Sequence, residues 1–244
     1  MLEEAHIALH ELENGHWWYV GARRVYRRLL DIALGQPSGA LRVLDAGCGS
    51  GGNLEIFEHY GPTVGMDISG LALQLAPQRP QLGLVQASAT ALPFASESFD
   101  SVNLMGVIEH LEDDVGALQE AARVCRPSGA VALLTSAFPI LWSHHDEANL
   151  HKRRYRAQEL RAKLRAAGLR PVRLTYQNFF VFPATLLVRL LQRRASNAPR
   201  YDMGNPPAWL NSLLIQLIGV ESWLLRFVDF PFGVDLIAIV RPDE

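Results

Sequence analysis

The sequence has few cysteines and no long uninterrupted apolar run. Its 244 residues include only two cysteines, Cys48 and Cys125, which are too few for a disulfide framework and show no metal-ligand spacing. Residues 1–20 are acidic and polar before Trp17 and lack the apolar segment of a secretion signal. No internal repeat is visible, and 49% of the residues are hydrophobic. We therefore expect a single domain over residues 1–244 in a reducing cytoplasm, without a metal.

Charge is divided unevenly along the chain, although the net charge is only −2. Residues 1–151 carry 8 lysines and arginines against 18 acids, a balance of −10. Residues 152–244 carry 15 against 7, a balance of +8. This asymmetry has two explanations: the local composition of helix surfaces, or a second half that meets an anionic partner such as a phosphorylated substrate or a membrane face.

Short apolar runs alternate with helical patterns, which predicts a parallel sheet covered by helices. The expected strands are residues 42–47, 63–67, 82–87, 99–106, 130–136, 170–177 and 234–242. The expected helices between them are residues 52–61, 69–78, 113–129 and 156–169. Ser69 is a typical N-cap, and Pro127 with Gly129 should end the third of these helices.

An apolar insertion, residues 178–233, separates the last two expected strands. Helical spacing predicts one helix within 179–194 and another within 207–228, and polar interruptions argue against a membrane span. On the second helix one stripe contains Trp209, Leu213, Leu217, Val220 and Leu224. Because this helix is apolar almost all round, we expect it to be largely buried. The insertion could belong to the core, cover a substrate pocket, pair with a second copy as a homodimer, or make a peripheral membrane contact.

The stretch "RVLDAGCGSGGNLEIF", residues 42–57, places glycines between an expected strand and an expected helix. Gly47, Gly49 and Gly52 fit the G-x-G-x-x-G pattern of a dinucleotide site, but Asp45 would repel a pyrophosphate there. The carboxylate suits S-adenosylmethionine, which has no phosphates and carries an ammonium and a sulfonium. Asp67 ends the next strand, where an acid can accept hydrogen bonds from both ribose hydroxyls.

Four ordered segments give the chain a family resemblance: "VLDAGCGSGG", "GMDIS", "ASATALPFASESFDSVNLMGVIEHLED" and "ARVCRPSGAVALLTS". Over about residues 40–170 they resemble the class I S-adenosylmethionine-dependent methyltransferases, most closely the type 11 and ubiquinone-biosynthesis branch. The resemblance implies a Rossmann-like α/β fold. Its seven-stranded sheet would have the order 3-2-1-4-5-7-6 with strand seven antiparallel, and helices on both faces.

The resemblance also assigns candidate residues for binding the cofactor. Asp45, Gly47, Gly49 and Gly51 match the motif that lies against the methionine part, and Cys48 and Asn53 belong to the same loop. The simpler explanation of Cys48 is a small buried filler. Asp67 matches the ribose-binding acid, and Ile68 the residue beside the adenine.

Further matches follow along the chain. Ser88 stands where the family usually has an aspartate for the adenine amino group, so that contact should be weaker, although the Ala89 N–H could still serve adenine. Met105 and Gly106 match the segment facing the methionine amino group, and Glu109 with His110 match a recurrent pair.

The N-terminal segment, within residues 1–35, resembles a helical lid that closes over the cofactor in some members. Arg23 or Arg24 could pair there with the cofactor carboxylate, or could belong to an exposed basic face.

The segment "LWSHHDEANLHKRRY", residues 141–155, follows the fifth strand at the edge where open α/β sheets bind substrate. A histidine beside an aspartate can be held in one tautomer and made more basic. His144, His145 and His151 are therefore candidate general bases, with Asp146 as the partner. Alternatively, Asp146 and His151 only tie the loop to Arg153 or Arg154.

These features predict an S-adenosylmethionine-dependent methyltransferase that releases S-adenosyl-L-homocysteine. The expected reaction is O-methylation of a hydrophobic, aromatic, or lipid- or sugar-linked small molecule. An NAD(P)-dependent oxidoreductase and a catalytically inactive methyltransferase-like binding protein are the alternatives. A nucleic-acid substrate is not expected, because the chain is net acidic and no base-flipping signature follows the fourth strand.

Overall fold

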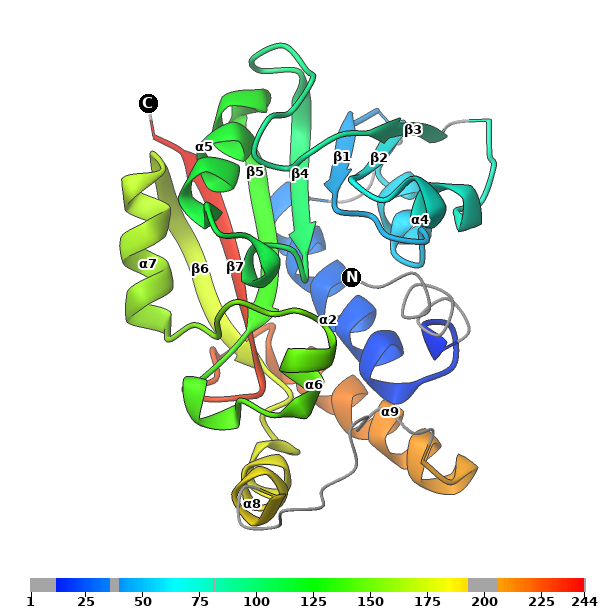
Figure 1. Cartoon of the computed structure of the whole chain (residues 1–244), viewed down its shortest axis with the longest axis vertical. Helices are drawn as coiled ribbons and strands as arrows, with labels where there is room; N and C mark the ends of the chain where they lie inside the picture. Colours follow the sequence, from blue (N-terminus) through cyan, green and yellow to red (C-terminus); the bar gives the residue numbers. More distant parts are fainter. Residues whose placement is uncertain (1–11, 36–39, 81, 193–205, 244) are drawn as a thin grey trace.

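The computed structural model describes residues 12–35, 40–80, 82–192 and 206–243 (Figure 1). A seven-stranded sheet in the order β3-β2-β1-β4-β5-β7-β6 forms the centre. Its strands are β1 (Val43–Ala46), β2 (Thr63–Asp67), β3 (Leu82–Gln86), β4 (Phe99–Met105), β5 (Cys125–Ser136), β6 (Leu169–Gln177) and β7 (Asp235–Pro242). β7 pairs antiparallel with both β5 and β6, whereas the other pairs are parallel. The predicted fold and strand order are confirmed.

Helices cover both faces of this sheet (Figure 1). They are α2 (Trp17–Leu34), α3 (Leu54–Glu58), α4 (Gly70–Leu75), α5 (Asp114–Val124), α6 (His144–Ala148), α7 (Ala157–Ala166), α8 (Phe182–Gln192) and α9 (Ala208–Leu224), with short 3-10 turns η1 (Ile108–His110) and η2 (Pro139–Leu141). Because α5 and α2 both contact β5 and β7, the centre of the sheet is shielded on its two sides.

Local sequence explains where these elements begin and what they bury. The side chain of Ser69 accepts a hydrogen bond from the Ala72 N–H, which confirms it as the cap of α4. α5 buries the apolar stripe Ala117, Leu118 and Ala121 against the sheet. All four residues of β1 are buried, as expected for a central parallel strand. This packing fixes the loops at the carboxyl ends of the strands.

The predicted boundary between α5 and β5 is wrong. The helix ends at Val124 and the strand begins at Cys125, so Pro127 and Gly129 lie within β5 instead of ending the helix. The ladder between β4 and β5 shifts register between Phe99 and Ser101, beside this segment. A proline is tolerated there because such an irregularity leaves ladder positions without a required N–H donor.

The predicted burial of the second insertion helix is also wrong. In α9 only Ile218, Glu221 and Ser222 are buried, whereas Trp209, Leu213 and Val220 from the predicted stripe are exposed. An apolar sequence indicates that burial of the helix would be favourable. It does not show that the rest of the chain has enough surface to cover the helix. No helix in the described part of the chain is both long and apolar enough to cross a bilayer.

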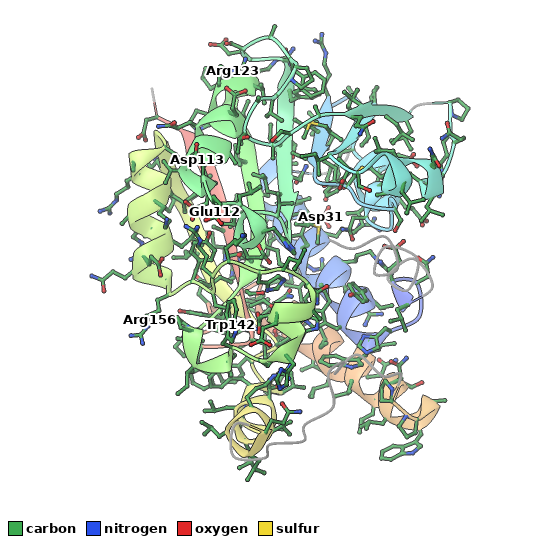
Figure 2. All side chains as sticks on the ribbon, viewed as in Figure 1. Asp31, Glu112, Asp113, Arg123, Trp142 and Arg156 are labelled. Carbon is green, nitrogen blue, oxygen red and sulfur yellow. The ribbon has the colours of Figure 1, made fainter. Side chains whose placement is uncertain are left out.

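The carboxyl ends of the parallel strands meet at one edge of the sheet, where the arrowhead of β4 points in Figure 1. The segment that contains α6 lies at this end, as do α8 and α9 (Figure 1). Trp142, which precedes α6, lies there too (Figure 2). The segment expected to form a lid contains α2, and the expected insertion contains α8 and α9; their roles over the cofactor and the substrate stay predictions. Residues 1–11 and 193–205 lie outside the described residues.

Candidate active site

The turn after β1 is shaped by three glycines with left-handed backbone angles. The φ values are 93° at Gly47, 54° at Gly49 and 85° at Gly51, which side chains of L-residues rarely tolerate. A Cβ on Gly47 would lie 2.4 Å from Val107 Cγ2, so that position also needs glycine for space. A Cβ on Gly49 would meet no described atom within 4 Å, so the turn presents bare backbone to open space. A ligand can approach this backbone closely.

Asp67 lies directly beside that turn. One oxygen of its carboxylate accepts a hydrogen bond from the Gly49 N–H at 2.9 Å, and the other accepts from the Ser69 N–H at 2.8 Å. These two bonds fix the carboxylate at the end of β2 and leave each oxygen capacity to accept another hydrogen bond. The next residue, Ile68, is 71% exposed, which is unusual for a large apolar side chain and suits a flat ligand ring.

Asp45 is the most unusual charged residue of this site. Its carboxylate is fully buried, and neither oxygen finds a hydrogen-bond partner among the described residues. Burial, with a smaller contribution from the negative charge of Asp67, raises the pKa of Asp45 to about 8. A buried carboxylate without donors is costly, so the site favours a ligand that brings a cation or hydrogen-bond donors. The ammonium of S-adenosylmethionine has that chemistry.

Other predicted cofactor residues lie at the same edge of the sheet. Gly106 follows Met105 at the end of β4, has a φ of 69°, and donates its N–H to the Leu134 carbonyl at 2.8 Å. The hydroxyl of Ser88 lies 2.8 Å from the Thr90 hydroxyl, so it is engaged within its own turn, and Ala89 is buried. The weaker adenine contact expected at Ser88 stays a prediction.

The N-terminal helix separates the two candidate arginines. Arg23 donates to the Gly52 carbonyl at 3.4 Å and to the Glu13 carbonyl, which places it beside the glycine turn. Arg24 instead donates to the Ile215 carbonyl of α9 at 3.3 Å. Arg23 therefore remains the candidate for the cofactor carboxylate, and Arg24 does not reach the turn.

Sequence analysis missed Glu13, whose buried carboxylate accepts a hydrogen bond from the Ser50 hydroxyl at 3.0 Å. No motif marked this residue, because its position depends on how the N-terminal segment folds back. Cys48 is buried, and burial raises the pKa of its thiol, which fits the filler role. Asn53 precedes α3 and makes no capping hydrogen bond through its side chain.

The second part of the site is built around Asp146 on α6. Its buried carboxylate is 2.9 Å from His151 Nδ1 and accepts from Arg154 Nε at 2.7 Å and from the Ser143 N–H at 2.9 Å. Burial alone would raise the pKa of Asp146, but the hydrogen bond from His151 and the charge of Arg154 hold it well below its usual range. Asp146 is thus a fixed anion that orients a histidine.

His151 therefore carries its proton on Nδ1, and its Nε2 is the basic atom. Its ring lies edge to face with His110, with 4.6 Å between the centroids. The backbone links the same two segments, because the Lys152 N–H donates to the Glu109 carbonyl at 2.7 Å. The loop that carries His151 is thereby held against η1, which follows β4. The side chain of Glu109 accepts a hydrogen bond from the Thr135 hydroxyl at 2.8 Å, which ties η1 to β5.

The other two candidate bases occupy different positions. His144 is exposed and lies 3.1 Å from the Glu147 carboxylate on the surface of α6. Burial lowers the pKa of His145 to about 4, so it is neutral at pH 7 and a weak base. Burial also lowers the pKa of His110. The geometry thus favours His151 among the three candidate bases. Its partner is the predicted Asp146, and Arg154, which the sequence suggested only as a contact that holds the loop, supports Asp146 in turn.

Arg153 is directed elsewhere, since it contacts the Asp114 carboxylate at 3.1 Å. Within the described ranges, no group of three or more histidine, cysteine, aspartate or glutamate side chains is placed to hold a metal ion. The site therefore consists of the glycine turn with Asp45 and Asp67, and a histidine–aspartate pair near the end of β4.

Comparison with known proteins agrees with this geometry. Residues 44–133 match a family model described as "Methyltransferase domain". A demethylmenaquinone methyltransferase of Renibacterium salmoninarum is 34% identical over 122 residues, which are 49% of this chain and 51% of the relative. A 2-phytyl-1,4-naphtoquinone methyltransferase of Thermosynechococcus vestitus is 30% identical over 127 residues, 49% of this chain and 56% of the relative. The chain spans about half the length of these curated relatives.

Solved structures share the fold at low sequence identity. Geranyl diphosphate C-methyltransferase from Streptomyces coelicolor A3(2), in complex with S-adenosyl-L-homocysteine, has a TM-score of 0.60 and 14% identity, with 88% of this chain and 74% of that one covered. The [4+2]-cyclase SpnF has a TM-score of 0.56 and 18% identity, with 89% and 81% covered. Residues 44–133 are therefore similar to a methyltransferase domain, and the chain shares its fold with these solved structures.

Proposed function

We propose that this protein transfers the methyl group of S-adenosylmethionine to a hydroxyl oxygen of a small, largely apolar molecule. The observation that carries the proposal is the glycine turn: bare backbone at Gly49, an adjacent fixed carboxylate at Asp67, and a buried carboxylate without donors at Asp45. A ligand with ribose hydroxyls and an ammonium fits these groups, whereas a pyrophosphate would be repelled by them.

The residues that would hold the cofactor follow from that turn. Asp67 would accept from the ribose, Asp45 would face the ammonium, and Arg23 would lie near the carboxylate. The bound cofactor supplies an activated methyl group with a neutral leaving group. The chain must therefore align the acceptor, and must also remove a proton where the accepting atom carries one that has to leave, as in a hydroxyl.

His151 is suited to remove that proton. Its Nε2 is free to accept because Nδ1 is engaged by Asp146, and the negative charge of Asp146 stabilises the imidazolium that forms. Ser143 and Arg154 hold Asp146 from two other directions. This support restricts the imidazole to one orientation and one tautomer, which is what proton transfer to a defined position requires.

The proposed acceptor is apolar for two reasons. Aromatic side chains pack beside the site, where the rings of Phe138 and Tyr176 stack with centroids 5.0 Å apart and Phe182 lies 5.6 Å from Phe138. The relatives named above act, by their names, on demethylmenaquinone and a phytyl naphthoquinone. Methyl transfer to a carbon is a second candidate, because one structural relative is named a C-methyltransferase.

The proposal is tested first by cofactor binding. Asp67→Ala should weaken binding of S-adenosyl-L-homocysteine in calorimetry by about 1–3 kcal/mol, because charged hydrogen bonds are lost. Asp113→Ala is the matched control: Asp113 accepts from the Gly116 N–H at the start of α5, away from the turn, and its loss should leave affinity unchanged. Equal affinity in wild type and Asp67→Ala, or tighter binding of NAD than of the methyl cofactor, would refute the assignment.

A further inference from the structure

Exposed apolar side chains are concentrated in one part of the molecule. Sixteen large hydrophobic residues are exposed in the described ranges, and eleven of them belong to α8, α9 and the residues beside them: Phe180, Leu187, Val188, Leu190, Leu191, Trp209, Leu213, Val220, Trp223, Phe227 and Val228. We call these eleven residues the apolar surface. Monomeric proteins rarely expose so many large apolar residues together, and such patches usually mark an interaction site.

On α9 the apolar surface is an ordered stripe. Trp209, Leu213, Val220 and Trp223 recur at intervals of three, four or seven residues, which places them on one side of the helix, and Phe227 follows in the turn after it. The opposite side packs on α2, where Gly21 lies against Ile218. α8 has no buried residue at all. Only a small part of the surface of α8 and α9 therefore packs against the rest of the chain, and most of it is accessible to solvent.

The exposed charges around the apolar surface are mainly positive. Of the described acids in residues 178–229, Glu221 is buried against the N–H groups of Asn178 and Phe179, and the exposed Asp229 is paired with Arg173 at 2.6 Å. The exposed Arg226 belongs to this region, and its guanidinium lies 5.7 Å from the ring centre of Phe227. Arg189 instead contacts the Gln192 side chain and lies near Asp146 and Arg154. The exposed Arg24 adds another positive charge at the flank of α9.

We propose that the apolar surface binds an anionic lipid bilayer. Tryptophan favours the boundary between headgroups and hydrocarbon, and arginines beside it gain from anionic headgroups. Since no described helix can cross a bilayer, the contact is peripheral, with α8 and α9 lying in the interface. A second copy of the chain fits less well, because a two-fold pair would bring the same arginines toward each other. Docking in this way would turn the carboxyl edge of the sheet toward the membrane (Figure 1).

The experiment is flotation of the full chain with vesicles of phosphatidylglycerol and phosphatidylcholine, compared with phosphatidylcholine alone. Wild type should bind the anionic vesicles more strongly, and salt should weaken this binding. The double variant Leu213→Ser/Trp223→Ser should bind about tenfold less or weaker still, because two apolar anchors are lost. Arg226→Gln should reduce binding to anionic vesicles several-fold and leave binding to neutral vesicles unchanged.

The matched control is Ile32→Ser/Val172→Ser. Leu213 and Trp223 are 56% and 53% exposed, and Ile32 and Val172 are 52% and 55% exposed but lie outside the apolar surface. The control should bind vesicles like wild type. Absence of wild-type binding, equal loss in both double variants, or a stable dimer that the α9 variant dissolves while vesicles stay unbound would overturn the proposal. Binding of S-adenosyl-L-homocysteine should be unchanged in all variants, so failure here is separable from failure of the proposed function.

Discussion

Asp146 decides which histidine of the cluster can act. Its carboxylate engages His151 and Arg154, so it fixes one imidazole and satisfies one buried guanidinium at the same time. Because the charge of Arg154 keeps Asp146 ionised, the proton between Asp146 and His151 remains on the histidine. The pair thus resembles the orienting half of a catalytic triad in its geometry.

Replacing His151 by alanine should lower kcat by roughly 10²–10⁴ if the acceptor is a hydroxyl. The affinity for S-adenosyl-L-homocysteine should stay constant, because the glycine turn is not altered. His144→Ala is the matched control and should keep wild-type turnover, since His144 is exposed beside Glu147. Steady-state kinetics with calorimetry checks both variants. If His151→Ala retains turnover, or loses cofactor binding and stability together, His151 only supports the loop.

The residues of the glycine turn could be predicted because backbone geometry fixes their type. Gly47, Gly49 and Gly51 all have left-handed angles that require glycine or strongly favour it. The choice among three histidines could not be made, because it depends on how α6 and the loop after it pack against the sheet. Spacing alone did not separate the exposed His144 from His151, five residues beyond Asp146.

At the level of elements, the crossing of α2 and α9 depends on one glycine. A Cβ on Gly21 would lie 2.6 Å from Ile218 Cδ1 and 3.2 Å from its Cβ. Around this point the Asn211 side chain accepts from the Trp17 N–H at 2.9 Å, and the Ser222 hydroxyl donates to the Arg24 carbonyl at 3.4 Å. The two helices can approach closely only because Gly21 has no side chain.

Gly21→Val should therefore destabilise the protein by about 1–3 kcal/mol through overpacking, although valine is a better helix former than glycine. Urea unfolding measures this change. Ile218→Ala alone should cost stability by leaving a cavity, but in the double variant it should recover part of the loss. Additive effects of the two substitutions in the double-mutant cycle would show that the contact does not determine the crossing.

Strands were easier to predict than helix surroundings. β1 and β4 are almost entirely buried, and short apolar segments mark them in the sequence, although Asp45 interrupts β1 and Asp100, Ser101 and Asn103 interrupt β4. For α9 the composition predicted a helix correctly and its burial wrongly. An apolar helix can be covered either by the protein core or by an external apolar partner, and composition does not distinguish the two. The start of β5 was misplaced because Pro127 is tolerated only where the ladder is irregular.

At the scale of the whole molecule, buried carboxyl groups make stability depend on pH. Burial raises the pKa of Asp45 to about 8, of Glu221 to about 7 and of Asp235 to about 6. Asp45 lies at the end of β1, whereas Glu221 on α9 and Asp235 at the start of β7 lie close together and both accept hydrogen bonds from Asn178. The unfolded chain releases these protons near pH 4, so between pH 4 and 8 the folded state holds more of them.

The free energy of unfolding should fall by on the order of 2 kcal/mol as the pH rises from 6.5 to 8.5. In this range folded Asp45 and Glu221 still bind protons that the unfolded chain has already released, so raising the pH favours the unfolded state. Below pH 6.5 the trend is opposed, because burial lowers the pKa of His145 to about 4 and the unfolded histidine binds a proton that the folded one does not. Urea unfolding without cofactor at several pH values measures the curve. Asp45→Asn/Glu221→Gln should flatten it above pH 6.5, whereas a wild-type free energy that is constant or rising in this range would mean that these carboxyl groups ionise normally in the folded protein.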